Sequence, residues 1–313
     1  MRVLIALGGN AMTGPDGGVT PEDQDRAVAE AMQHVADLVA EGVEVVLTHG
    51  NGPQVGNLLV KNELAAEVVP PVPLDWCGAQ TQATIGFLMM DALDAALAAR
   101  QVRKSVSSIV TRTLVDGNDP GFATPTKPIG RFLPEADARP LMEHGETWED
   151  RGAKGWRRVV ASPEPIEILD APAIKTLVEA GFVVVGAGGG GIPVVRGEDG
   201  VLRGVPAVID KDLSAALLAR QVGADVLVIA TDVDSVRLDY GTENERPLGS
   251  ASVTELRRIQ QEQGFASGSM GPKVEATIRF VEGGGTRAVI TSLGNITEAV
   301  RGKAGTVVEE DSE

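Results

Sequence analysis

Short, mostly apolar runs alternate along the chain with longer segments in which apolar residues recur every three or four positions. The runs cover residues 2–7, 43–48, 105–111, 182–185, 226–230, 287–291 and 305–308. Such runs are typical of strands buried on both faces, whereas the wider spacing is typical of amphipathic helices. Their regular alternation predicts an α/β fold with a mainly parallel central sheet and helices on both faces.

The first helical segment has clear start signals. Thr20 stands at the N-cap position, Pro21 follows at the first helical position, and acidic residues come next. Val28 and Val35 then lie on one predicted apolar face until Gly42 ends the helix. Further helices are predicted at 79–100, at 171–180 with Asp170 as cap, at 213–220, at 254–263 and after residue 273.

Residues 116–165 break this rhythm. The segment is rich in Pro, Gly, Arg and Trp, and neither spacing persists for long. Short hairpins are expected there, with Phe132, Trp148 and Trp156 available to pack. An insertion of this kind within an α/β chain is typical of a functional lid.

Composition narrows the class of protein. The 313 residues carry a formal net charge of −16, which argues against nucleic acid or an acidic membrane surface as a partner. A single cysteine, Cys77, excludes an internal disulfide and fits a reducing compartment. No unbroken apolar run approaches the ~20 residues of a membrane span, and no signal peptide precedes the first strand. A cytoplasmic protein is expected.

Small and polar residues gather at the turns that follow the predicted strands. These turns are residues 8–10, 49–52, 186–191, 231–234 and 267–273. In parallel sheets ligands bind at the carboxyl ends of the strands, where such turns meet. The clustering predicts an anion-binding cleft of nucleotide size.

Two lysines are predicted to stand at helix N-termini. Lys211 lies between Asp210 and Asp212, and Asp212 is the expected N-cap of the helix that follows. Lys273 begins another helix directly after Gly271-Pro272. A lysine opposes the helix dipole at this end, but it is suited to a bound phosphate. The alternative is a solvated Asp-Lys-Asp turn on the surface.

Several motif-based functions are excluded. Gly186-Ala-Gly-Gly-Gly-Gly191 satisfies G-x-G-x-x-G, but an extended segment follows it where a dinucleotide-binding turn needs a helix. We expect the backbone of Gly188 and Gly189 to approach phosphate instead. No P-loop and no G-x-S-x-G motif occurs, and His34, His49 and His144 lack zinc-ligand spacing.

Phosphoryl transfer needs cations and N–H donors around the transferred group, and no covalent chemistry from the protein. The lysines and glycine-rich turns supply those parts without a Walker sequence. Asp210, Asp212 and Asp232 are expected either to hold the lysines in place or to reach Mg²⁺ through water.

Ten segments, in order along nearly the whole chain, resemble the carbamate kinases of the amino acid kinase family. The longest are Thr48-His-Gly-Asn-Gly-Pro-Gln-Val-Gly-Asn57, Pro125-Thr-Lys-Pro-Ile-Gly130, Val208-Ile-Asp-Lys-Asp212 and Gly268-Ser-Met-Gly-Pro-Lys-Val-Glu275; the others are 8–10, 73–78, 118–120, 155–158, 187–193 and 231–234. The resemblance implies a three-layer αβα sandwich with an acceptor lobe, residues 1–204, and a nucleotide lobe, residues 205–313. It also implies a protruding subdomain at about 116–165, a homodimer, a place in arginine metabolism, and reversible transfer between ATP and carbamate with Mg²⁺.

The resemblance assigns roles to matching positions. It implies catalytic roles for Lys127, Lys211, Lys273, Asp210 and Asp212; a substrate cradle of Gly8, Gly9, Asn10, Gly50, Asn51 and Gly52; and nucleotide contacts from Lys211, Thr231, Asp232, Val233, Asp234, Tyr240, Met270, Gly271, Pro272 and Lys273. Two positions depart from the family pattern: Ala83 replaces a glycine expected near the acceptor, and Arg237 replaces a tyrosine expected near the nucleotide. The alternatives are a kinase of the same fold acting on another small carboxylate, phosphonate or phosphate, and a catalytically silent nucleotide-binding regulator.

Overall fold

The structure is a computed structural model that describes residues 1–9, 20–265 and 270–311. The strands of its central sheet are β1 (Arg2–Leu7), β2 (Glu44–His49), β3 (Val106–Ser108), β9 (Val183–Val185), β12 (Val226–Thr231), β15 (Ser250–Ser252), β16 (Arg287–Ser292) and β17 (Thr306–Glu309). They lie in the order β15-β17-β16-β12-β1-β2-β9-β3. The six strands from β16 to β3 are mutually parallel, and β17 pairs with β16 in the antiparallel sense.

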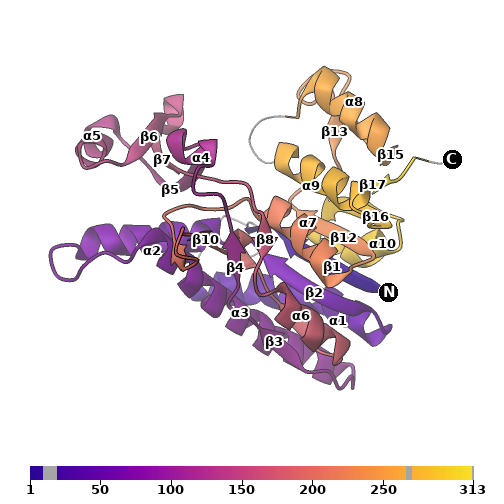
Figure 1. The fold of residues 1–313 in the computed structure, drawn as a ribbon. Coiled ribbons are helices and arrows are strands. Elements are labelled where there is room, and N and C mark those ends of the chain that lie inside the picture. The colour runs from indigo at the N-terminus through magenta and orange to yellow at the C-terminus, as the bar shows by residue number, and fades with distance from the viewer. Residues whose placement is uncertain (10–19, 266–269, 312–313) are drawn as a thin grey trace.

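Helices cover both faces of this sheet (Figure 1). One face carries α1 (Pro21–Ala40), α3 (Leu74–Ala99) and α10 (Ile296–Val300); the other carries α6 (Ala171–Glu179), α7 (Lys211–Val222), α8 (Val253–Gln263) and α9 (Met270–Glu282). The predicted three-layer αβα sandwich with a mainly parallel sheet is confirmed.

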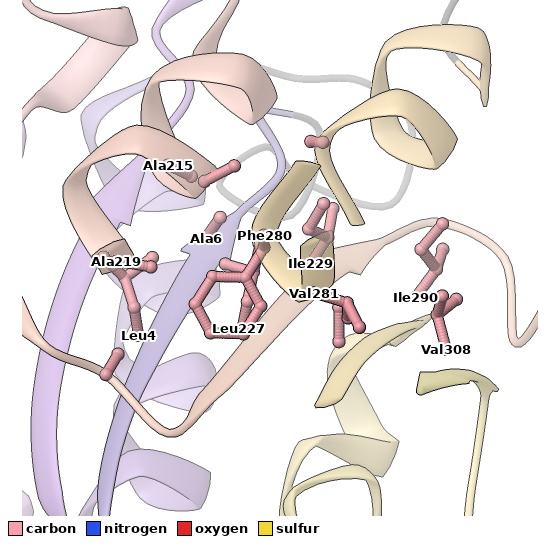
Figure 2. Close-up of a cluster of buried hydrophobic side chains, with 14 of the residues drawn as sticks. Leu4, Ala6, Ala215, Ala219, Leu227, Ile229, Phe280, Val281, Ile290 and Val308 are labelled. Atoms are coloured by element: carbon pink, nitrogen blue, oxygen red, sulfur yellow. The ribbon is translucent and has the colours of Figure 1, made fainter. Parts of the chain in front are cut away.

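Strand β1 contributes side chains to the hydrophobic cores on both faces of the sheet. Leu4 and Ala6 pack toward α7 and α9, whereas Ile5 packs toward α1, because successive side chains point to opposite faces of a strand. Figure 2 shows the first of these cores, in which Leu4 lies near Phe280 of α9. Phe280 is fully buried, and burial of such a side chain contributes about 1.5–3 kcal/mol.

The predicted helix caps are partly confirmed. Thr20 accepts a hydrogen bond from the Asp23 N–H at the start of α1, and Gly223 ends α7 in the left-handed conformation with φ 69°. Asp170 stands at the N-cap position of α6, as predicted. Its side chain makes no cap hydrogen bond, because Arg112 holds the carboxylate through a 2.8 Å ion pair.

Further elements lie outside the central sheet and its covering helices. They are α2 (Gly52–Ala65), β4 (Arg112–Leu114), α4 (Pro120–Ala123), β5 (Lys127–Leu133), α5 (Glu135–Glu143), β6 (Thr147–Asp150), η2 (Gly152–Lys154), β7 (Trp156–Val160), β8 (Glu167–Ile168), η3 (Gly188–Gly190), β10 (Ile192–Arg196), β11 (Leu202–Gly204), β13 (Arg237–Leu238), β14 (Arg246–Pro247) and η4 (Leu293–Asn295). A second sheet has the order β11-β10-β4-β8, and β13 pairs with β14.

The segment between β4 and β8 projects from the sandwich beside α2 (Figure 1). It forms an antiparallel sheet of order β5-β7-β6, which agrees with the hairpins expected there. Helix α5 was not predicted. Its Ala138 packs with Leu133 and Trp148 in a small core of their own.

Helix α3 begins five residues earlier than expected, at Leu74 instead of Ala79. Among the described residues it is the one helix long and apolar enough, by length and composition, to cross a membrane. Polar residues interrupt its sequence, and 39% of its most apolar stretch is buried. The buried side chains, such as Met89 and Leu93, pack in the core with residues of α1, as they do in core helices of globular proteins.

Candidate active site

Asp210, and not Asp212, caps helix α7. Asp210 has extended backbone angles, and its Oδ1 accepts hydrogen bonds from the N–H groups of Asp212 at 2.9 Å and Leu213 at 3.3 Å. The prediction for Asp212 is therefore wrong, because Asp212 is already the second residue of the helix. The correction leaves Lys211 at the helix N-terminus, as its first residue.

Three lysines converge on the two aspartates. Lys127 Nζ of β5 lies 2.7 Å from Asp210 Oδ2, and Lys273 Nζ of α9 lies 3.1 Å from Asp212 Oδ2. Lys211 pairs with the other carboxylate oxygen of Asp212. A solvated surface turn is excluded, because Asp212 is only 3% exposed and Lys273 only 6%. We call these five residues the lysine cluster.

The lysine cluster carries more positive than negative charge. Burial and the neighbouring charge of Lys273 lower the pKa of Lys211, while Asp212 opposes this effect. Burial alone would raise the pKa of Asp210, yet its ion pair with Lys127 and the charge of Lys211 hold that pKa below its usual value. With three cations on two carboxylates, an added anion would be stabilised here.

Glycine-rich turns lie directly against the lysine cluster. A side chain on Gly50 would place Cβ 2.7 Å from Gly9 N and 3.3 Å from Lys211 Cδ. No real Cβ is accommodated so closely, so the approach of these turns depends on glycine at position 50. The predicted cradle residues Gly8 and Gly52 lie in the same two turns, at the ends of β1 and β2.

The cradle offers free backbone donors. The Gly8 and Gly50 N–H groups extend the sheet, to Ala230 O at 2.8 Å and Leu7 O at 2.9 Å. Among the residues the structure describes, the N–H groups of Gly9, Asn51 and Gly52 donate no hydrogen bond. Helix α2 starts at Gly52 and has no side-chain cap, so its N-terminus also favours an anion.

Asn10, the remaining predicted cradle residue, lies outside the described residues, as do Ser267, Gly268 and Ser269. Thr81 holds the cradle, because the Asn51 side chain donates a hydrogen bond to its hydroxyl at 2.8 Å. Ala83 is exposed on α3, so this departure from the family pattern does not reach the cradle.

The turn at 186–191 packs beneath the cradle. As expected, it leads through η3 into strand β10 and not into a helix. A Cβ on Gly188 would overlap the His49 ring, and one on Gly189 would overlap the Asn51 amide. These two glycines therefore let the turns meet; their contact with phosphate stays a prediction.

Most of the predicted nucleotide residues lie at the carboxyl end of β12 and at the start of α9. Thr231 ends β12 and donates to Asp232 at 2.9 Å, and Asp234 accepts from Asn295 at 3.2 Å. Val233, Met270, Gly271 and Pro272 are half-buried. Tyr240, by contrast, is 74% exposed after β13. Arg237, the second family departure, is also exposed.

The aspartates do not form a metal cage. Within residues 1–9, 20–265 and 270–311, no group of three or more His, Cys, Asp or Glu side chains could hold an ion. Lysines engage both Asp210 and Asp212, so of the two expected roles the structure supports holding the lysines.

Comparisons with known proteins show the family to which the chain belongs. The profile of the amino acid kinase family matches residues 1–292, and the chain belongs to that family. It is 49% identical to carbamate kinase of Thermococcus kodakarensis and 47% identical to that of Pyrococcus furiosus, each over 98% of both chains. The structure of carbamate kinase from Giardia lamblia bound to AMP-PNP superimposes with a TM-score of 0.92 at 41% identity, covering 99% of this chain and 98% of that one. The resemblance predicted from the sequence is confirmed.

Proposed function

We propose that the protein transfers a phosphoryl group reversibly between ATP and carbamate, so that ADP and carbamoyl phosphate give ATP and carbamate. The observation that carries this proposal is the convergence of three lysines beside a cradle of free N–H groups. Carbamate is already an anion, so its oxygen can attack phosphorus without a general base. The protein then has to position both substrates and stabilise charge on the transferred group.

In this proposal each part of the site has one task. The N–H groups of the cradle hold carbamate or the carbamoyl end of carbamoyl phosphate. Lys211 and Lys273 neutralise the transferred phosphoryl group and its leaving oxygen, while Asp212 keeps the two ammonium groups in place. Nucleotide phosphates, with Mg²⁺ bound to them, would extend from Gly188 and Gly189 toward Thr231 and Met270.

Lys127 acts in this proposal from a lid. It stands at the start of β5, in the projecting segment, and its ion pair with Asp210 places it against the helix that carries Lys211. Gly130 of the same strand packs on Gly56 of α2, because a Cβ added at Gly56 would lie 3.3 Å from the Cα of Gly130. The lid can thus cover the cradle and exclude water from labile carbamoyl phosphate.

We further propose a cytoplasmic homodimer in arginine metabolism, with residues 1–204 as the acceptor lobe and 205–313 as the nucleotide lobe. The homodimer has a physical argument. Trp76 and Phe87 are 63% and 53% exposed, and with Ala83 they lie at helical spacing on one face of α3. Large exposed apolar side chains that share one face are typical of subunit interfaces.

The direct test is ATP formation from ADP, Mg²⁺ and carbamoyl phosphate, with acetyl phosphate as the matched phosphoryl donor. We expect turnover with carbamoyl phosphate and little with acetyl phosphate. Equal turnover with both would favour a kinase for another small carboxylate, and nucleotide binding without turnover would favour a regulator.

A further inference from the structure

His49 is a buried titratable side chain in the cradle turn, to which the reaction above assigns no role. It ends β2 and is 1% exposed, and its Nδ1 lies 3.0 Å from the carbonyl oxygen of Gly50. A carbonyl oxygen only accepts hydrogen bonds, so Nδ1 must carry the proton in this contact.

The opposite edge of the ring lies against Gly188. A Cβ on Gly188 would overlap Nε2 and Cε1 of His49. The φ angle of Gly188 is not left-handed, unlike that of Gly189, so its backbone could accept a larger residue and the ring is what excludes one. Gln82 fixes Gly188 in turn, donating to its carbonyl at 3.0 Å. The imidazole is therefore held between the Gly50 carbonyl and Gly188.

The His49 contact orients a peptide of the cradle. In a planar trans peptide the Gly50 carbonyl and the Asn51 N–H point in opposite directions. When His49 holds the carbonyl on its own side, the Asn51 N–H is directed away from the ring. That N–H is one of the free donors of the cradle.

The ring is neutral at neutral pH. Burial lowers the pKa of His49 to about 4; the Gly50 carbonyl opposes this effect, and the charge of Lys211, the charged group that faces the ring, adds to it. A neutral imidazole with its proton on Nδ1 donates to Gly50 without repelling Lys211.

We propose that His49 is a positioning residue for carbamate and carbamoyl phosphate, which holds the Gly50 carbonyl through Nδ1–H and so aims the Asn51 N–H at the bound substrate. The inference rests on the proposed function, because the substrate that the N–H binds is the one assigned there. It assigns no proton transfer to His49.

Three substitutions separate the donor from the bulk of the ring. In His49→Asn the amide Nδ2 stands where Nδ1 stood, whereas in His49→Gln it lies farther out and in His49→Leu it is absent. We expect the Gln and Leu variants to lower kcat/KM for carbamoyl phosphate by about 10-fold or more, with ADP affinity unchanged by calorimetry. His49→Asn should stay within about threefold of wild type. An Asn variant that folds and is impaired as strongly as Leu overturns the proposal.

Two further experiments test the role of His49 where these three variants cannot. Should His49→Leu fail to fold, Gly188→Ala is compared with the double variant G188A/H49N. Asn is shorter than the ring, so the double variant should be the more active of the two, and an equal or greater loss overturns the proposal. A limb in the wild-type pH profile between about pH 5 and 8 that disappears in His49→Asn would also overturn it, because His49 would then transfer a proton.

The inference can fail separately from the proposed function. Lack of ATP formation by the wild type refutes the proposed function alone. The tautomer of His49 is read in the ligand-free protein by ¹⁵N NMR, in which only three histidines contribute. Neutral imidazole with its proton on Nδ1 down to about pH 5 supports the inference, and an Nε2–H tautomer or a cation at pH 6 overturns it.

Discussion

Lys127 Nζ and Asp210 Oδ2 lie 2.7 Å apart although 83 positions separate the two residues in the sequence. The pair joins the first strand of the projecting segment to the residue that caps α7. One aspartate thus fixes both the lid and the helix that presents Lys211.

Removal of the Lys127 side chain should separate catalysis from nucleotide binding. Lys127→Ala is expected to lower turnover with carbamoyl phosphate by about 10-fold or more, because one cation and the lid contact are lost. ADP affinity, measured by calorimetry, should remain near the wild-type value. If both quantities remain at wild-type values, the projecting segment is not a catalytic lid.

Asp210 should show two separable contributions. Asp210→Asn keeps a good N-cap side chain but loses the charge that holds Lys127, whereas Asp210→Ala loses both. We expect the Ala variant to be less stable than the Asn variant by about 1 kcal/mol in urea unfolding, and both to lose activity. Equal unfolding free energies would contradict the assignment of Asp210 as the cap.

The buried charge of Lys211 should lower the stability of the folded protein, although turnover depends on it. Its folded-state pKa lies below the unfolded value of 10.5, first because of burial, so its charged form is less favourable in the folded protein. The cost is present at neutral pH and disappears as the pH rises to 10.5. Lys211→Met should therefore raise Tm at pH 7 while lowering turnover, and the gain in Tm should shrink at high pH. A lower Tm at pH 7 would show that the ion pair with Asp212 outweighs burial.

The exposed face of α3 predicts the oligomeric state. Wild type should sediment as a dimer of 32.6 kDa chains, and Phe87→Asp should shift it toward the monomer, because the carboxylate would be buried at the interface. Val201→Asp is the matched control, since Val201 is 50% exposed in the turn between β10 and β11. A stable, active wild-type monomer would refute the homodimer.

The sheet and its helices could be predicted because they follow from local periodicity. The position of a helix cap could be predicted where one candidate residue stood alone. Thr20 was such a case, but Asp210 and Asp212 flank Lys211 symmetrically, and backbone angles outside the sequence pattern decide between them. Asp170 takes the predicted N-cap position of α6, but Arg112, 58 positions away, binds its carboxylate.

The candidate site was predictable as a set of motifs but not as a set of contacts. The sequence indicated Lys211 and Lys273 through their helix starts, and Lys127 through family resemblance. It gave no sign that Asn51 binds Thr81, or that His49 packs on Gly188, because these pairs depend on the packing of α3 and η3 against the cradle. The one sequence feature that indicated close packing around the cradle was the Gly-Asn-Gly segment that directly follows His49.

Lys273→Met is the decisive test of whether buried lysines stabilise charge on the transferred phosphoryl group. Methionine keeps the length and apolar stem of this buried side chain and removes its charge, and Lys175→Met on the exposed face of α6 is the control. With ADP, Mg²⁺ and carbamoyl phosphate, we predict that kcat falls by about 10²-fold or more in Lys273→Met and stays at the wild-type value in the control. A folded Lys273→Met variant with kcat within about threefold of wild type would contradict the account.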